Sequence, residues 1–183
     1  MCMNCAVQID QSRADHFAET MIGMLNHSAL IAMTAIGHRT GLFEAMKALP
    51  PATSGQIAEK AGLNERYVRE WLGAMVTGRM VDYQPRTGTY HLPAEHAAWL
   101  TEGGAGNFGV TAQWLHVMTA VEDRVVECFR TGGGLDYNEY KRFNEVMADE
   151  SSQTVVAPLI GTLLPLVKDL PEKLARGIAV LDV

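Results

Sequence analysis

The stretch from Ala52 to Leu92 constrains the fold more than any other part of the sequence. It begins with ATSGQIAEKAGLNERYVREWLGAM, in which a short helix, a glycine turn and a second amphipathic helix follow one another. It continues with VDYQPRTGTYHL, two alternating strands on either side of a Pro-Arg-Thr-Gly turn. This order of elements predicts a winged helix-turn-helix domain, and the obvious function of such a domain is DNA binding.

The charge of this stretch argues against DNA binding. From Ser54 to Leu92 the basic residues are Lys60, Arg66, Arg69, Arg79 and Arg86, and the acidic ones are Glu59, Glu65, Glu70 and Asp82. Affinity for nucleic acid comes mainly from a surplus of Lys and Arg on phosphates. The whole chain instead carries a formal net charge of −6. We therefore expect a winged-helix fold that does not bind nucleic acid.

The segment before this stretch is unusually apolar. ADHFAETMIGML, residues 14–25, places apolar side chains at helical spacing, and Ser28 is positioned to cap a second helix. Between Glu19 and Arg39 there is no Lys, Arg, Asp or Glu, but polar residues and glycines interrupt this run, so we expect no membrane span. One small winged helix cannot cover so much apolar surface. We expect the helices to form a homodimer interface.

Length and composition are those of an ordinary globular chain. The 183 residues are 48% hydrophobic and 20% charged, which argues against wholesale disorder. No basic region precedes an apolar run at the N-terminus, so we expect no secretory signal and a cytoplasmic location. Cys2 and Cys5 stand in a tail, residues 1–13, that we expect to be disordered. No further cysteine or histidine pair completes a four-ligand site, and we predict no metal site.

The remainder of the chain is predicted to be helical almost to its end. GAGNFG, residues 104–109, matches G-x-G-x-x-G, but it follows a helix rather than a strand, so a flexible hinge is favoured over a phosphate site. Amphipathic helices are predicted over 111–129 and 137–148, and a strongly apolar one from Ser151. IAVLDV, residues 178–183, has the pattern of a buried strand.

The final RGIAVLDV resembles motif I of class I S-adenosylmethionine-dependent methyltransferases, in which a hydrophobic strand ends in Leu-Asp and runs into a glycine loop around the cofactor. The order of the preceding elements resembles the bacterial subgroup that carries an N-terminal winged-helix domain. YKRFNEVM, residues 140–147, is similar to the aromatic-plus-methionine helix that lies over the cofactor in that subgroup.

The resemblance implies three cofactor-binding residues. Asp182 would help to hold the cofactor's loop and methionine end, while Phe143 and Met147 would pack near it. Simple core packing is the other interpretation of each of these residues. No glycine loop follows Asp182, and the family's ribose-binding acidic residue and catalytic base have no counterpart here. No catalytic residue is therefore predicted.

The predicted fold class is mainly α. It comprises a winged-helix dimerisation domain at 14–100, a helical linker or lid at 101–176, and the first strand of an incomplete Rossmann-like domain at 177–183. The resemblance implies the N-terminal portion of a methyltransferase truncated at motif I, inactive as this isolated chain. In the parent enzyme it implies S-adenosylmethionine as cofactor and a small-molecule methyl acceptor.

Two alternatives come from other functional classes. The first is a dimeric winged-helix transcription regulator, in which Arg66, Arg69 and Arg86 would contact DNA phosphates. The second is a non-catalytic remnant that binds a small molecule or a partner protein. Salt-sensitive DNA binding distinguishes the first alternative from the methyltransferase interpretation.

Overall fold

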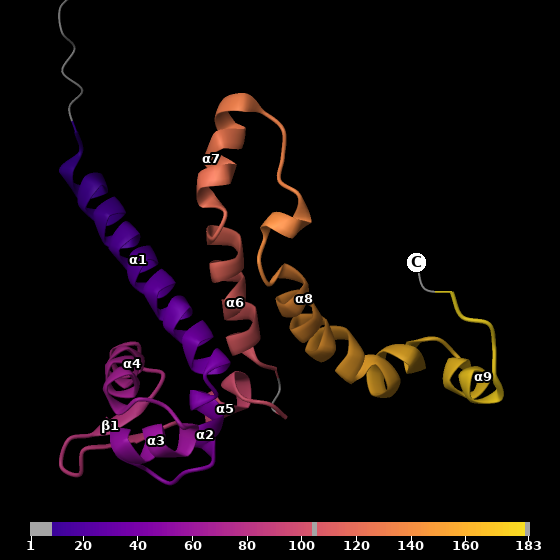
Figure 1. Cartoon of the computed structure of the whole chain (residues 1–183), viewed down its shortest axis with the longest axis horizontal. Coiled ribbons are helices and arrows are strands. Elements are labelled where there is room, and N and C mark those ends of the chain that lie inside the picture. Colours follow the sequence, from indigo (N-terminus) through magenta and orange to yellow (C-terminus); the bar gives the residue numbers. More distant parts are fainter. Residues whose placement is uncertain (1–8, 104–105, 182–183) are drawn as a thin grey trace, which may run out of the picture.

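The computed structural model describes residues 9–103 and 106–181, and its chain is mainly helical (Figure 1). The elements in chain order are α1 (Gln11–Arg39), α2 (Leu42–Lys47), α3 (Ser54–Ala61), α4 (Glu65–Thr77), β1 (Asp82–Gln84), β2 (Thr89–His91), α5 (Ala94–Leu100), α6 (Phe108–Thr119), α7 (Glu122–Thr131), the 3-10 turn η1 (Tyr137–Glu139), α8 (Phe143–Ser151), the π-helical turns η2 (Ser152–Val156) and η3 (Leu159–Leu163), the 3-10 turn η4 (Leu164–Leu166), and α9 (Leu170–Arg176).

The predicted winged helix-turn-helix is confirmed in α3, α4 and the β1–β2 hairpin. Thr53 and Gln56 form a capping box at the start of α3, which ends at Gly62 with a left-handed φ of 67°. The side chain of Asn64 then caps α4 by accepting a hydrogen bond from the Arg66 amide. The two strands pair antiparallel, with Tyr83 opposite Tyr90.

The core of this domain includes the C-terminal half of α1. Phe43 of α2 and Trp71 of α4 pack edge to face, with ring centroids 5.2 Å apart. The Trp71 indole donates a hydrogen bond to the Met33 carbonyl of α1 at 2.8 Å. Gly37 brings α1 this close, because a Cβ at that position would lie 2.4 Å from the Trp71 ring. The first helix is thereby fixed onto the winged-helix domain.

α1 is one continuous helix of 29 residues, so the prediction of two helices was wrong. The Ser28 hydroxyl does not cap a new helix; it donates to the Met24 carbonyl one turn earlier, at 2.9 Å. Asp10 caps the helix, so Gln11–Arg13 are helical although the tail was expected to be disordered. Cys2 and Cys5 lie outside the described residues.

The N-terminal half of α1 projects away from the winged-helix domain (Figure 1). By length and composition alone, α1 is apolar enough to cross a membrane, and the segment Phe143–Leu166 with α9 passes the same test only as a pair bent by 110°. The C-terminal half of α1, however, packs against α2, α4 and α6. Only this half of α1 therefore belongs to the core, and most of the helix's apolar stretch is exposed.

The helices after the wing form a second layer on α1. α6 lies along the C-terminal half of α1, and α8 packs back onto α6 (Figure 1). The single helix predicted over 111–129 is interrupted after Thr119, where Ala120 and Val121 separate α6 from α7. Trp114 of α6 meets Phe143 of α8 with ring centroids 5.2 Å apart. This layer brings the start of α6 and the end of α8 to the last turn of α1.

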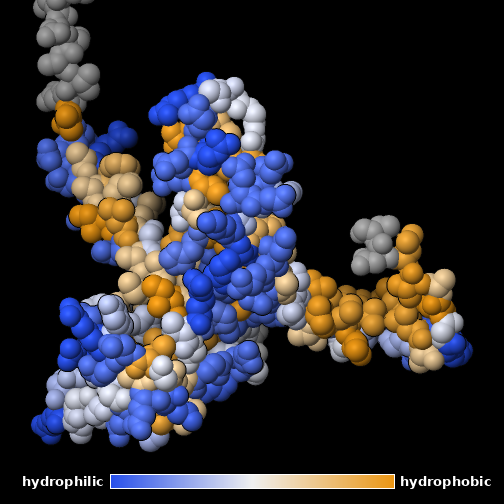
Figure 2. Space-filling view, viewed as in Figure 1, coloured by the Kyte–Doolittle hydropathy of each residue, from blue (hydrophilic) through white to orange (hydrophobic). Residues whose placement is uncertain are grey.

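The segment from η2 to Leu181 extends away from these layers (Figure 1). Its apolar side chains are exposed and form a nearly continuous hydrophobic surface (Figure 2): Val155, Val156, Leu159, Ile160, Leu163, Leu166, Val167, Ile178, Val180 and Leu181. Pro158 and Pro165 interrupt regular helix here, because proline has no backbone N–H to donate. Within the described part, residues 177–181 of the predicted strand form no strand, since no neighbouring strand is present to pair with them.

Candidate functional site

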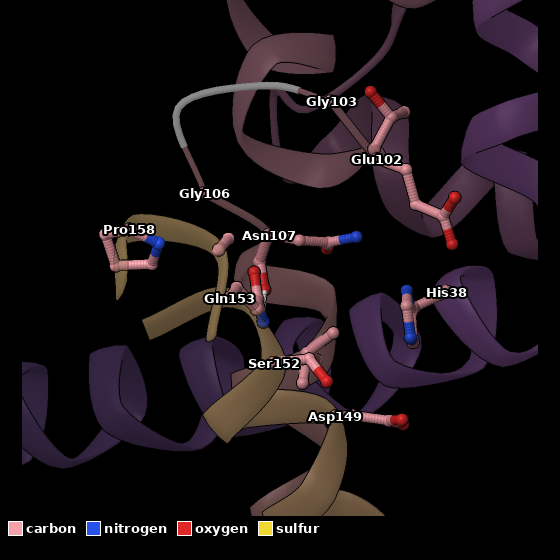
Figure 3. A pocket seen from close by; sticks show the side chains of 12 residues that line it. His38, Glu102, Gly103, Gly106, Asn107, Asp149, Ser152, Gln153 and Pro158 are labelled. Carbon is pink, nitrogen blue, oxygen red and sulfur yellow. Dashed lines mark hydrogen bonds between the residues drawn. The ribbon is translucent and has the colours of Figure 1, made fainter. Parts of the chain in front are cut away.

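A cavity of about 670 Å³ lies between the end of α1, the start of α6 and the end of α8 (Figure 3). This volume is in the usual range for small-molecule sites. The residues that line the cavity come from these three helices, from the loop after α5, and from η2 and the two residues that follow it: His38, Thr101, Glu102, Gly103, Gly106, Asn107, Val110, Asp149, Ser152, Gln153, Ala157 and Pro158.

Glycine and asparagine at the start of α6 position His38. A Cβ at Gly109 would lie 2.8 Å from the Cβ of His38, so only glycine lets α6 begin directly against the last turn of α1. The Asn107 side chain caps this helix, with its Oδ1 accepting from the Gly109 amide at 2.9 Å. The last glycine of the G-x-G-x-x-G match therefore serves helix packing. Gly104 and Ala105 lie outside the described residues.

The loop after α5 is tied to α2 through the backbone of Glu102. Its amide donates to the Glu44 carboxylate at 2.6 Å, and its carbonyl accepts from the Lys47 ammonium at 2.9 Å. These bonds hold the main chain and leave the Glu102 side chain free, and the carboxylate lies on the His38 side of the cavity (Figure 3).

The α8 wall of the cavity is anchored by an acidic side chain. Glu150 accepts hydrogen bonds from the Trp114 indole at 2.8 Å and from the Thr111 hydroxyl at 3.2 Å, both on α6. Asp149 precedes it, and the π-helical turn η2 begins directly after α8. The Gln153 amide of that turn reaches the Asn107 carbonyl at 3.4 Å. π-Helical turns are frequent at functional sites, because they change the direction in which side chains point.

His38 is neutral at neutral pH in this environment. Burial lowers the pKa of His38 below its usual 6.5, and this outweighs the carboxylates of Asp149, Glu102 and Glu44, which raise it. Arg142 adds a smaller lowering effect. A neutral imidazole offers one hydrogen-bond donor and one acceptor. The site therefore combines negative carboxylates with an uncharged histidine.

Gln113 lies further along α6, one turn after Gly109. Its Oε1 accepts a hydrogen bond from the Arg142 guanidinium at 2.6 Å, and Arg142 also pairs with Glu145 at 2.7 Å. The Nε2 of Gln113 is buried and has no partner among the described residues. This network holds the start of α8 against α6.

Phe143 and Met147, two of the residues predicted to bind cofactor, do not line the cavity. Phe143 packs in an aromatic cluster with Trp114, Tyr137 and Tyr140. Met147 is 42% exposed on the outer side of α8, while Val146 is buried. Asp182 lies outside the described residues. The cofactor roles of Phe143, Met147 and Asp182 therefore stay predictions.

Sequence reasoning missed the residues that form the cavity. It placed none of His38, Glu102, Asp149 and Gln153 in a site. The available signal was Asn107 followed by Gly109, a helix cap with a glycine in the first turn. The described residues contain no group of three or more His, Cys, Asp or Glu that could hold a metal ion.

Comparison with known proteins identifies the N-terminal domain and the fold. Residues 28–102 match the family described as the Rv2258c-like winged HTH domain. No curated protein matches the sequence.

Solved structures with a similar fold are methyltransferases. Human N-acetylserotonin methyltransferase in complex with SAM is 11% identical, with a TM-score of 0.56 over 81% of this chain and 43% of its own. Mitomycin 7-O-methyltransferase MmcR is 18% identical, with a TM-score of 0.57 over 78% of this chain and 47% of its own. CalO1, a methyltransferase in calicheamicin biosynthesis in its SAH-bound form, is 17% identical, with a TM-score of 0.56 over 88% of this chain and 50% of its own. The chain spans about half the length of these proteins.

Proposed function

We propose, on the premise that this chain has the fold of the N-terminal part of class I S-adenosylmethionine-dependent methyltransferases, that it is the dimer-forming and acceptor-binding portion of such an enzyme. One observation carries the proposal. The likeness extends over 78–88% of the chain in two of these structures, far beyond the winged helix at residues 28–102. The arrangement of α6 and α8 on α1, which forms the cavity, is thus part of what is similar.

The cavity is the proposed site of the methyl acceptor. It has the volume of a small-molecule site, and its walls are held by the hydrogen bond from the Glu102 amide to the Glu44 side chain of α2 and by the cap at Asn107. Methyl transfer requires the acceptor to be held in a fixed, desolvated position, because orientation supplies much of the rate. The helical layer at 101–176 would provide this positioning.

The described residues do not by themselves fit the cofactor. They contain one two-stranded antiparallel sheet, whereas the resemblance places S-adenosylmethionine at the carboxyl edge of a parallel sheet. We propose that the exposed apolar residues between Val155 and Leu181 are covered in the intact enzyme by its cofactor domain (Figure 2). The 183 residues alone should then lack methyl-transfer activity.

The proposed assembly is a homodimer in the cytoplasm. The projecting half of α1 carries exposed apolar side chains, among them Phe17, Met21, Met24 and Leu25. Two copies of the same helix can bury these residues against each other around a twofold axis.

The experiment compares residues 1–183 with the same protein extended by whatever its gene encodes after Val183. Binding of S-adenosylmethionine is measured by calorimetry, and transfer of its labelled methyl group into a small-molecule extract is measured by scintillation counting. The extended protein should bind the cofactor and transfer label, and residues 1–183 should do neither. Methyl transfer by residues 1–183, or an extended protein that does not bind the cofactor, would contradict the proposal.

A further inference from the structure

We infer that the cavity at His38 recognises its ligand through a protonated amine. Identifying this ligand as the methyl acceptor rests on the proposed function, but the recognition itself is a property of residues in this chain.

The ionised side chains that line the cavity are both acidic. Glu102 and Asp149 line it, and no Lys or Arg is among the described lining residues. In the described part of the chain, neither carboxylate forms an ion pair or a side-chain hydrogen bond. Lys47 binds the Glu102 carbonyl, and Arg142, whose charge acts on Asp149 from a distance, forms its ion pair with Glu145. A cationic ligand would therefore find two unpaired carboxylates.

The neutral polar groups complete such a site. Asn107 is only 9% exposed, and its Oδ1 is used by the Gly109 amide. Its NH2 group points toward the space beside Glu102 and His38 and has no partner among the described residues (Figure 3). It can donate to a hydroxyl or carbonyl oxygen of the ligand, while uncharged His38 can accept from an ammonium group.

The apolar part of the cavity lies away from the acidic part. Figure 3 shows Pro158 at the opposite side from His38 and Glu102, and Val110 and Ala157 add apolar surface. The ligand that fits is a small molecule with an apolar body and one ammonium group. An acid of the same shape would place its negative charge beside Glu102 and Asp149, so it should be excluded.

The test uses residues 1–183 and three probes with the same phenol ring: tyramine, which ends in an ammonium group, tyrosol, which ends in a hydroxyl, and 4-hydroxyphenylacetate, which ends in a carboxylate. Binding is measured by calorimetry and ligand-observed NMR at millimolar probe concentrations. Tyramine should bind about tenfold more tightly than tyrosol, and 4-hydroxyphenylacetate should bind least. Equal binding of the three probes, no binding of any of them, or a preference for the acid overturns the inference.

Matched variants locate the recognition in the cavity. Glu102→Gln and Asp149→Asn should each weaken tyramine binding about five- to tenfold and leave tyrosol binding unchanged. Glu102 is held through its backbone, so its side chain can change without loss of the loop. Glu95→Gln, which removes an exposed carboxylate from α5, is the control and should leave tyramine binding unchanged. Equal weakening by Glu95→Gln would show a general charge effect and overturn the inference.

The result is separable from the proposed function. If tyramine has no advantage while the extended protein transfers methyl groups, amine recognition is wrong and the methyltransferase proposal stands. If tyramine has its advantage but the extended protein does not bind S-adenosylmethionine, the cavity is an amine site in a protein of another activity.

Discussion

Two glycines near Trp71 have opposite surroundings. A Cβ on Gly37 of α1 would lie 2.4 Å from the Trp71 ring and 2.7 Å from Phe43, whereas a Cβ on Gly73 of α4 would meet nothing within 4 Å. Both lie within helices, where alanine is intrinsically better than glycine by up to about 1 kcal/mol. The difference in stability between alanine at position 37 and alanine at position 73 therefore measures the effect of the contact between α1 and α4.

We predict that Gly37→Ala lowers the free energy of unfolding by about 1–3 kcal/mol, because the added methyl group overpacks the core. Gly73→Ala is the control and should raise the free energy of unfolding by up to about 1 kcal/mol. Urea denaturation followed by circular dichroism measures both changes. Equal stabilisation by the two substitutions would mean that α1 does not pack on Trp71 as described.

Side chains with local roles were predictable, and side chains with distant partners were not. Gly62 and Asn64 act within a few residues of themselves, as turn and cap, and the glycine turn between the two helices was predicted. His38 obtains its environment from Glu102 and Asp149, which belong to other elements far along the chain. Its pattern on α1 shows only that it lies near the edge of an apolar face.

At the level of elements, the predicted boundaries of helices and strands were wrong where the local sequence signal was ambiguous. Ser28 has the residue type of a helix cap, but a serine hydroxyl inside a helix can equally donate to the carbonyl four residues earlier, as it does here. The strand pattern of residues 178–181 could not become a strand alone, because its hydrogen bonds must go to a neighbour. Helix and strand periodicity reports the local preference but not whether a partner is present.

The projecting half of α1 carries the prediction about assembly. Phe17, Met21, Met24 and Leu25 recur at spacings of three and four residues and are exposed (Figure 2). We predict that Leu25→Glu weakens self-association at least tenfold, because a carboxylate would be buried in an apolar interface without a partner. Sedimentation equilibrium over a range of protein concentrations measures the dimer dissociation constant.

Asn26→Glu is the matched control for this substitution. Asn26 is exposed and follows Leu25 directly in the helix. The substitution Asn26→Glu therefore adds the same charge in the same turn, but about 100° around the helix from Leu25. Its effect on association should be small. A wild-type chain that is monomeric at high concentration, or equal effects of the two substitutions, would contradict an interface on this face of α1.

At the scale of the whole molecule, the apolar surfaces and the charges point to the same kind of partner. Exposed apolar residues are concentrated on the projecting half of α1 and on residues 155–181, at opposite ends of the chain (Figure 2). Hydrophobic surfaces of this extent are covered by protein rather than by nucleic acid. The formal net charge of −6 agrees with that assignment.

The winged helix provides the most direct test of this view. α4 carries two exposed arginines, Arg66 and Arg69. The Arg69 guanidinium lies 3.8 Å from the Glu65 carboxylate, so one of the two already has a carboxylate beside it. Glu65 also accepts a hydrogen bond from the Ser54 hydroxyl at 2.7 Å, which holds that carboxylate at the start of the helix that would enter the major groove. A phosphate approaching there would meet negative charge.

We predict that the protein does not form a specific complex with double-stranded DNA, and that any binding is weak. Fluorescence anisotropy with a labelled duplex, measured between about 50 and 200 mM salt, should show no affinity beyond the non-specific level. Because phosphate contacts make affinity fall steeply with salt, a true DNA reader would show a tight complex that weakens by orders of magnitude over this range. The double substitution Arg66→Ala and Arg69→Ala should change nothing. A tight, salt-sensitive complex that this substitution abolishes would restore the transcription-regulator interpretation, because it would place phosphates on the face of α4 that Glu65 disfavours.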